Sequence, residues 1–590
     1  MKKLLWTAEE RENVQEILAN ETWIQISGQD DSDFLLESLL SNTTISEIVF
    51  LDIFTMDIDQ ITELLSTNKC LKSVEFVDCE YLDELFYDLD WESLSITDLL
   101  LDRSYVDENF KVISKCKSLK NLVIKGSFVP FADLKYVIAN SQIESLSIEA
   151  NEMPLKLLKE ITDEILVCNR IVSLNISETC NSVGVIESIG KLLSSRIQKL
   201  KAGPFRLESK AGKNSNANLV KLAKKFKKSK LKSLSLYGVP LTDQFFLNIG
   251  PGFDQLSKLR LDSCEINDVT VPYLAEFVCK TIVELDFSRN KIGNHGLEIL
   301  TNAMISNEHF HTLDITENEF DEDGFIHITR LLSESKLRRL ILDGNHISKK
   351  AMEFLAKGMR KNKSMYSLYL EGCDYKIDDL QVLFESLYDH KYLFGVYMNK
   401  DVRDYPEAER AAELSKLTQQ IGKLLKNNKN IRQLGCNLQR IVELVHIDDQ
   451  LRMVEMEPED EMQNILSCIQ DNYSVTWIGE PNEYFYDDKK RYSDLGEYRG
   501  FVPITNRNSI LQTKRAKEFF LSARKYLLLD LPGDLIYYML NRSFLWALIH
   551  PRYQKDIVKC LMNKENVGKV LSNARFSPAV LHEVCCELNK

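Results

Sequence analysis

The stretch LRRLILDGNHI, residues 337–347, carries the pattern that decides the fold of this 590-residue chain. Apolar residues occupy its first, fourth, sixth and eleventh positions, and asparagine occupies the ninth. The pattern begins six times between residues 231 and 375, at Leu231, Leu256, Ile282, Phe310, Leu337 and Met365. The second leucines of these copies are 25, 26, 28, 27 and 28 residues apart. So regular a step indicates an internal structural repeat.

Each copy predicts a short strand followed by a helix. Apolar and polar residues alternate around the second leucine, as in a strand with one buried face. Residues with helical apolar spacing follow, for example in the segments 296–300 and 324–332. One strand and one helix cannot bury their own leucines, but stacked units can. The sequence therefore predicts an α/β solenoid, with parallel strands on the concave face and helices on the convex face.

The ninth position of the pattern is expected to satisfy the backbone where the chain leaves the strand. An asparagine amide there both donates and accepts hydrogen bonds, so it would leave few buried backbone groups unpaired. Asn290, Asn318 and Asn345 hold this position in the best copies. Other copies have cysteine instead, and we interpret these residues as buried turn residues: Cys79, Cys264 and Cys373.

The repeat resembles the leucine-rich repeat, and in particular the ribonuclease-inhibitor-like class. The segments 290–296 and 318–324 match its Asn-x-Ile-x-x-x-Gly motif best. This resemblance covers residues 20–400 strongly and 400–480 weakly. It implies a horseshoe that binds another protein on its concave side.

The same pattern predicts the organisation of the chain. Residues 1–20 are expected to form an N-terminal capping helix, and residues 21–400 the leucine-rich repeat solenoid. Residues 401–500 read as degenerate repeats with insertions, because the steps there lengthen to 38 and 44 residues. Residues 501–590 have helical but non-repetitive patterns and predict an all-helical C-terminal domain.

Composition limits the class of protein. With 44% apolar residues, 27% charged residues and a net charge of -14, the chain resembles an ordinary soluble protein and not a typical nucleic-acid binder. No apolar run is long enough to span a membrane, and the N-terminus becomes charged too early for a signal peptide. Thirteen cysteines without paired spacing indicate reduced thiols in the cytoplasm. We expect a monomer.

A basic segment, residues 221–230, follows a predicted loop at 203–216. Its lysines suit either an anionic partner or a nuclear import signal. The alternative is a solvated outer face, because Leu219, Leu222 and Phe226 form an apolar stripe at helical spacing. We favour the solvated face.

The candidate partner site lies on the concave face. Side chains that flank the second leucine, and the one after the third apolar residue, point to that side. Tyrosine and arginine there are typical interface anchors, and a row of acidic residues favours a partner with a basic patch. The predicted binding residues are Tyr237, Arg260, Asp286, Asp314, Arg339, Ile341, Tyr369 and Tyr397.

Catalysis is not indicated by the sequence. His309 and His311 flank one repeat position, but two histidines do not complete a zinc site. No glycine-rich phosphate loop or nucleophile triad signature is present. An open concave surface is also not expected to shift the pKa of a carboxyl group as a pocket does. We therefore predict a non-enzymatic protein with no catalytic residues, no cofactor and no metal.

Three further resemblances suggest more specific roles. Residues 531–540 are similar to the opening of an F-box, which would make the chain a ubiquitin ligase adaptor through Leu531, Pro532, Asp534, Leu535 and Leu540. F-boxes usually precede such repeats, whereas this segment follows them. The GTPase-activating proteins for Ran use a solenoid of this class with an arginine at a repeat edge, a position that Arg289 fits. Degenerate repeats with additional C-terminal helices also resemble effectors that intracellular bacteria deliver into the host cytoplasm.

Overall fold

The computed structural model describes residues 18, 22–27, 32–53, 56–80, 82–205, 215–227, 229–249, 253–398, 406–428, 430–431, 433–435 and 477–479. The chain divides into two compact units, Met1–Ser386 and Leu387–Lys590. Within the described ranges, no helix has the length and apolar character needed to cross a lipid bilayer.

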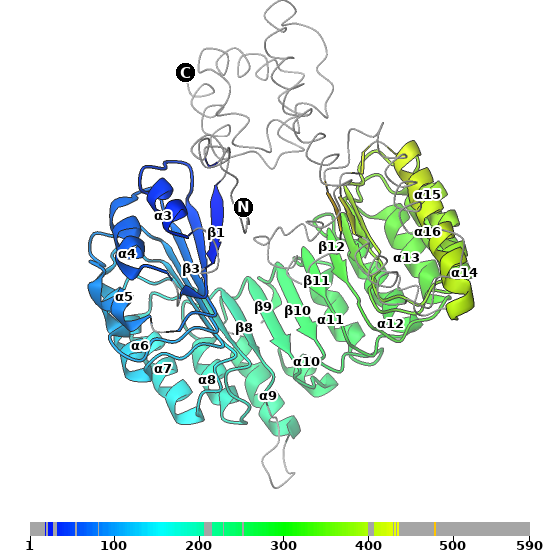
Figure 1. Cartoon of the computed structure of the whole chain (residues 1–590). Coiled ribbons are helices and arrows are strands. Elements are labelled where there is room, and N and C mark those ends of the chain that lie inside the picture. The colour runs from blue at the N-terminus through cyan, green and yellow to red at the C-terminus, as the bar shows by residue number, and fades with distance from the viewer. Residues whose placement is uncertain are drawn as a thin grey trace, which may run out of the picture. The chain divides into compact units, whose positions relative to one another are not determined.

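The first unit contains one parallel sheet in which each strand pairs with the next strand along the chain. Register is constant, so the second leucines align, as Leu259 does with Leu234 and Leu285. The strands line the inner side of the arc that this unit forms (Figure 1). They are β1 (Trp23–Ser27), β2 (Glu47–Leu51), β3 (Ser73–Val77), β4 (Asp98–Asp102), β5 (Asn121–Lys125), β6 (Ser145–Glu149), β7 (Ser173–Ser177), β8 (Lys199–Gly203), β9 (Ser233–Tyr237), β10 (Lys258–Asp262), β11 (Glu284–Asp286), β12 (Thr312–Asp314), β13 (Arg339–Ile341) and β14 (Ser367–Tyr369).

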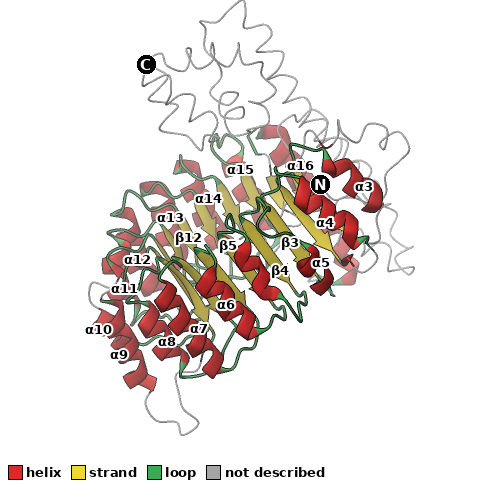
Figure 2. Ribbon diagram, turned by 90° about the vertical axis from the view of Figure 1, so that its left-hand side faces the viewer, coloured by secondary structure: helices red, strands yellow, loops and turns green. Residues whose placement is uncertain are grey.

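Helices follow the strands and cover the outer face of the sheet (Figure 2). They are α3 (Ser32–Leu40), α4 (Ile58–Thr67), α5 (Asp83–Asp88), α6 (Phe131–Asn140), α7 (Leu155–Cys168), α8 (Val185–Leu192), α9 (Ser215–Phe226), α10 (Asp243–Ile249), α11 (Val271–Val278), α12 (Asn294–Ile305), α13 (Gly324–Glu334), α14 (Lys349–Lys361) and α15 (Ile377–Leu387). The repeat between β4 and β5 has a 3₁₀ helix, η2 (Phe110–Lys115), where the other repeats have an α-helix. Its strands are only 23 residues apart, and a 3₁₀ helix covers more length per residue than an α-helix.

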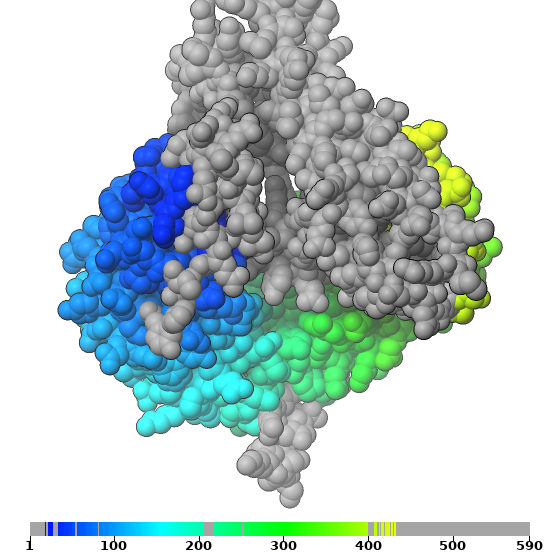
Figure 3. Space-filling view, in the orientation of Figure 1, coloured from blue at the N-terminus to red at the C-terminus, as the bar shows by residue number. Residues whose placement is uncertain are grey.

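The core of the first unit lies between the sheet and the helices. The second leucines of the six best copies are at most 1% exposed. The space-filling view shows the colours of this unit following one another in chain order, because each repeat packs against its neighbours (Figure 3). The predicted solenoid is therefore confirmed.

Side-chain amides join successive repeats where the chain leaves each strand. The Nδ2 group of Asn290 donates to the carbonyl oxygens of Leu261, Phe287 and Ser288 at 2.7, 3.0 and 2.9 Å. Its Oδ1 accepts from the backbone N–H groups of Cys264 and Ile266 at 3.0 and 2.9 Å. The amide thus satisfies backbone groups of two adjacent repeats.

The other residues at this position have related roles. Asn318 and Asn345 make the same kind of bonds as Asn290. The thiol of Cys264 lies 3.4 Å from the carbonyl oxygen of Leu236, and the thiol of Cys373 lies 3.2 Å from that of Leu342. Burial raises the pKa of both thiols to about 12, so they are poor nucleophiles at neutral pH. Their interpretation as buried turn residues agrees with this geometry.

A second set of polar side chains lies where several helices end and the next strand pattern begins. In the turn before Met365 the residue is asparagine, three positions before the first apolar residue: Oδ1 of Asn362 accepts from the N–H of Met365 at 2.6 Å. In the turn before Leu337, which is one residue shorter, it is serine: Oγ of Ser335 accepts from the N–H of Leu337 at 3.2 Å. The shorter turn thus uses the shorter side chain for the same acceptor role.

The second unit adds α16 (Glu407–Asn427) and the strands β15 (Gly395–Tyr397), β16 (Gln433–Gly435) and β17 (Trp477–Gly479). These strands pair in parallel, with Val396 opposite Leu434 and Leu434 opposite Ile478. Asn428 repeats the turn just described, because its Oδ1 accepts from the N–H of Ile431 at 3.1 Å. The degenerate repeats predicted from Leu434 and Ile478 therefore form strands.

Several predictions concern residues outside the described ranges. These are the capping helix at 1–20, apart from the buried Leu18, the helical domain at 501–590, and the F-box-like residues 531–540. The domain limits drawn from the sequence stay predictions.

Replacing the buried amide at the strand exit tests its contribution. We expect Asn290→Ala to lower the free energy of unfolding by about 3 kcal/mol, because it leaves several buried backbone groups without partners. Urea denaturation followed by circular dichroism measures the effect. Asn140→Ala is the control, since its exposed amide makes one bond, to the carbonyl oxygen of Tyr136. Equal losses in the two variants would contradict the role assigned to Asn290.

Candidate partner-binding surface

Strand register places most of the predicted binding residues in rows across the sheet. One row runs across five adjacent strands and consists of Arg260, Asp286, Asp314, Ile341 and Tyr369. The neighbouring row contains Arg339, between Thr312 and Ser367. Tyr237 lies opposite Asp262 at the ends of β9 and β10. Tyr397, on β15 of the second unit, lies opposite Gly435.

Solvent exposure differs along the row from Arg260 to Tyr369, which is called the main row below. Arg260 and Asp286 are half-buried, whereas Asp314, Ile341 and Tyr369 are 4%, 2% and 7% exposed. Tyr397 is 2% exposed. The guanidinium carbon of Arg339 lies 4.9 Å from the ring centroid of Tyr369, within cation–π range. The row therefore changes from accessible charged groups on β10 and β11 to buried apolar groups on β13 and β14.

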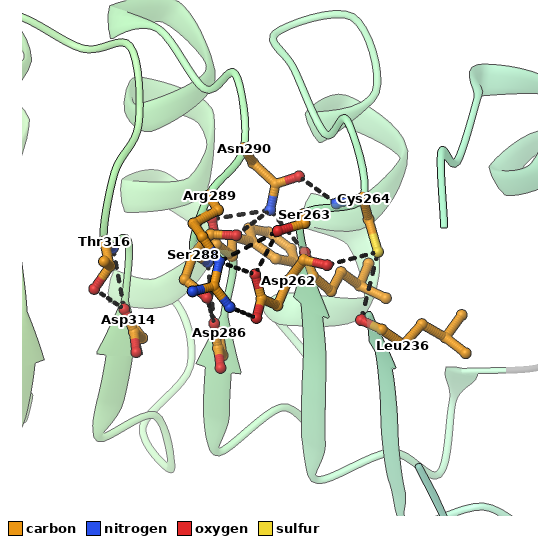
Figure 4. A network of polar contacts seen from close by, with 12 residues as sticks. Leu236, Asp262, Ser263, Cys264, Asp286, Ser288, Arg289, Asn290, Asp314 and Thr316 are labelled. Atoms are coloured by element: carbon orange, nitrogen blue, oxygen red, sulfur yellow. Dashed lines mark hydrogen bonds and ion pairs between the residues drawn. The ribbon is translucent and has the colours of Figure 1, made fainter. Parts of the chain in front are cut away.

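Arg289 belongs to a polar network at the strand exits, shown in Figure 4. Its Nε lies 2.9 Å from Oδ1 of Asp262, and its Nη2 pairs with the other carboxylate oxygen. The guanidinium carbon is 5.7 Å from the ring centroid of Tyr237. The hydrogen bond to Asp262 raises the pKa of Arg289 further. The arginine singled out for a Ran-type role is thus held by a carboxylate of the preceding repeat.

Two aspartates of the main row share a local motif. Oδ1 of Asp286 accepts from the N–H and the hydroxyl of Ser288 at 3.0 and 2.7 Å. Oδ1 of Asp314 accepts from the N–H and the hydroxyl of Thr316 at the same distances. An Asp-x-(Ser/Thr) pattern at the strand end thus turns each carboxyl group towards its own chain (Figure 4).

Burial changes the protonation of this surface. Burial and the charge of Asp286 raise the pKa of Asp314 to about 7. Burial also raises the pKa of Asp343 to about 7, although the N–H of Glu371 and the charge of Arg339 oppose it. The expectation that an open concave surface leaves carboxyl groups unshifted was wrong, because desolvation raises the pKa values of Asp314 and Asp343.

The basic segment forms the outer part of a helix. On α9, Lys221, Lys224 and Lys225 are exposed, while Leu222 and Phe226 are at most 1% exposed. The helix ends at Phe226, four residues before the predicted limit. The favoured interpretation, a solvated face over an apolar stripe, agrees with this arrangement.

Across the part of the chain that the structure describes, no three His, Cys, Asp or Glu side chains converge as metal ligands. His309 and His311 flank the buried Phe310 at the turn into β12.

The sequence analysis missed two features. One is the row of asparagine and serine acceptors before the strands, which the fixed spacing to the first apolar residue could have revealed. The other is a pair of exposed aromatic side chains, Tyr105 and Phe128, at the strand exits of adjacent repeats. Their separation equals the 23-residue step between Leu99 and Leu122, so the repeat register could have placed them side by side.

Ionisation of the half-buried Asp343 gives a pH-dependent prediction. The pKa of Asp343 is raised from the ordinary value of 3.8 to about 7 in the folded protein. As pH rises, the unfolded chain therefore loses this proton at a lower pH than the folded protein does. The free energy of unfolding consequently falls between about pH 4 and about pH 7. We expect Asp343→Asn to raise the free energy of unfolding at pH 8 by on the order of 1 kcal/mol, with little change at pH 4. Urea denaturation at both pH values measures this. The exposed Asp254→Asn variant is the control, and the same gain at both pH values would refute the assignment.

Comparisons with known proteins found one family-model match and several solved structures. A family model described as a leucine-rich repeat matches residues 278–300. The solved structures include an internalin from Listeria monocytogenes, with 14% identity, a TM-score of 0.27, and coverage of 72% of this chain and 94% of that one. They also include TLR13 in its complex with ssRNA13, with 14% identity, a TM-score of 0.35, and coverage of 71% and 56%. A third is the actin-binding site 2 of leiomodin-1, with 17% identity, a TM-score of 0.18, and coverage of 25% and 73%. The strand–helix units in constant register and the matched segment show that this chain contains leucine-rich repeats.

Proposed function

We propose that this protein is a non-catalytic scaffold that holds a protein partner with a basic patch on the concave face of β9–β14. The observation that carries the proposal is the register that aligns the half-buried Arg260 and Asp286 on adjacent strands of a longer row. Charged side chains held in register on an extended concave sheet suit the recognition of another macromolecule.

The charge balance of this face supports a cationic partner. Lys258 pairs with Glu284 at 2.7 Å, and Arg289 pairs with Asp262, so these charges largely cancel. Desolvation raises the pKa values of the carboxyl groups of Asp286 and Asp343, although both side chains remain partly exposed. A lysine or arginine of a partner beside them would stabilise the ionised form, so binding should strengthen as pH rises through 7.

The proposed setting is the cytoplasm, and for a delivered effector the cytoplasm of the host. The cysteines among the described residues are free thiols, which supports a reducing compartment. The subtype of the repeat, the effector role, the ligase-adaptor role through residues 531–540 and the Ran-type role of Arg289 are narrower predictions from the sequence. Co-purification with a cullin-scaffold adaptor, lost on changing Leu531 and Pro532 to Ala, would support the adaptor role. A complex without any such scaffold would count against it.

A charge-reversal experiment tests the concave face. The full chain serves as bait, captured proteins are identified by mass spectrometry, and affinities are measured with the identified partner. We expect Arg260→Glu with Glu284→Lys to weaken binding at least about tenfold, because the exchange swaps a positive and a negative charge between the adjacent strands β10 and β11 and so disrupts charge complementarity with the partner. Affinity of the unmodified chain should also fall with added salt.

The matched control reverses the same two charges on the convex face. Lys357→Glu with Glu353→Lys, both exposed on α14, should leave affinity unchanged. Equal loss in both double variants, or unchanged binding by the concave variant, would reject the concave placement.

A further inference from the structure

A cavity opens at the strand-exit edge of the first unit, away from the rows of the concave face. It has a volume of about 420 Å³ and lies between the repeats of β5 and β6, beside the start of α6. Its lining combines apolar side chains, including Ile124, Leu134 and Ile148, with the polar Ser127 and Asn151. The volume falls in the range of about 300–1,000 Å³ that is typical of ligand pockets.

Two aromatic rings stand at the mouth of this cavity. Tyr105 and Phe128 line it and are 48% and 47% exposed. Their rings are stacked, with centroids 6.4 Å apart and an interplanar angle of 22°. Their backbones are fixed, because Tyr105 donates to the carbonyl oxygen of Cys79 at 2.9 Å and Phe128 to that of Ser104 at 3.0 Å. The rings therefore form a preorganised apolar surface that remains accessible to solvent.

Carboxylates flank the aromatic pair on both sides. The turn positions of consecutive repeats place Glu80, Tyr105, Phe128 and Glu152 in one row, since the preceding residues of each repeat are joined by hydrogen bonds. Glu80 and Glu152 are exposed, and neither has an ion-pair partner in the described ranges. Asp107, two residues after Tyr105, is also exposed. The nearby Arg103 is already bound by Asp78, with bonds of 2.6 and 2.8 Å, so its charge is compensated.

The row from Glu80 to Glu152 has the length of a short extended peptide. Adjacent strands are about 4.8 Å apart, so three steps from Glu80 to Glu152 span about 15 Å, which about five extended residues cover at about 3.3 Å each. A small apolar molecule would fill the cavity but would not reach Glu80. A second copy of this chain, with a net charge of -14, would be repelled by this acidic edge.

We propose that this edge is a second docking site, which binds a short extended segment of another protein that carries an aromatic or aliphatic anchor next to Lys or Arg. The anchor enters the cavity between the repeats of β5 and β6 and contacts Tyr105 and Phe128. The flanking cations bind Glu80 and Glu152, and a cation above the exposed rings gains cation–π stabilisation. The site is separate from the concave rows, so it does not depend on the function proposed above.

Peptide selection tests the site. A displayed library of random peptides about eight residues long is selected on the full chain and counter-selected on the Tyr105→Ala, Phe128→Ala variant. We expect enriched peptides to combine an apolar anchor with Lys or Arg, and a labelled peptide of that sequence to bind the double variant at least about tenfold more weakly by fluorescence anisotropy. Glu80→Gln with Glu152→Gln should weaken binding and reduce its dependence on salt.

Two control variants distinguish binding at this site from non-specific binding to exposed aromatic residues and from binding to the concave face. Tyr87 and Tyr136 are exposed aromatic residues on helices α5 and α6, at 72% and 51%, and replacing both with Ala should leave peptide affinity unchanged. The concave variant Arg260→Glu, Glu284→Lys should also bind the peptide normally.

Three outcomes would overturn the proposal. The first is the absence of any peptide that distinguishes the chain from the double variant. The second is a neutral or acidic consensus. The third is self-association in sedimentation that disappears in the Tyr105→Ala, Phe128→Ala variant, which would make a second copy the occupant.

Discussion

Hydrogen bonds from buried side-chain amides to the backbone of the neighbouring repeat are the interaction on which this solenoid depends. Parallel strands pair each other's backbone N–H and C=O groups only along their length. The chain must then turn out of the sheet through a buried region, where these groups need other partners. Asn290, Asn318 and Asn345 supply both donors and acceptors at that point. Because each amide bonds two repeats, it fixes the register that aligns the leucines below and the charged rows above.

The sequence was sufficient to predict the repeats because period and strand alternation are local signals. The positions of the strands and the role of Asn290 followed from one pattern. Exposure was not predictable in the same way, because alternation gives the direction of a side chain but not what surrounds it. Ile341 and Tyr369 point to the predicted face and are nevertheless buried. The Tyr105–Phe128 pair depends on a contact between repeats, which no single copy displays. The acceptors before the strands are local, and their spacing to the first apolar residue is a signal in the sequence.

The acidic character of the concave face is weaker than its composition indicates. Formal counting gives every aspartate a full negative charge, yet Asp314 and Asp343 have pKa values of about 7. Asp262 and Glu284 are already paired with cations. The electric field at this surface therefore depends on the pH of the solution and on the charge of the molecule that approaches it. The edge near Glu80 and Glu152 differs, since its carboxylates are exposed to solvent.

The correspondence between turn length and side chain where helices meet strands has a consequence for how such a chain can change over generations. If one residue is deleted from a turn like that of Asn362, the asparagine side chain is too long for its oxygen to accept from the N–H of the first apolar residue. If the asparagine is also changed to serine, the turn has the arrangement found at Ser335. Two coupled genetic changes thus convert one repeat length into the other without disturbing the strands. Whole repeats could then be duplicated, lost or exchanged at these junctions while the adjoining units keep their geometry.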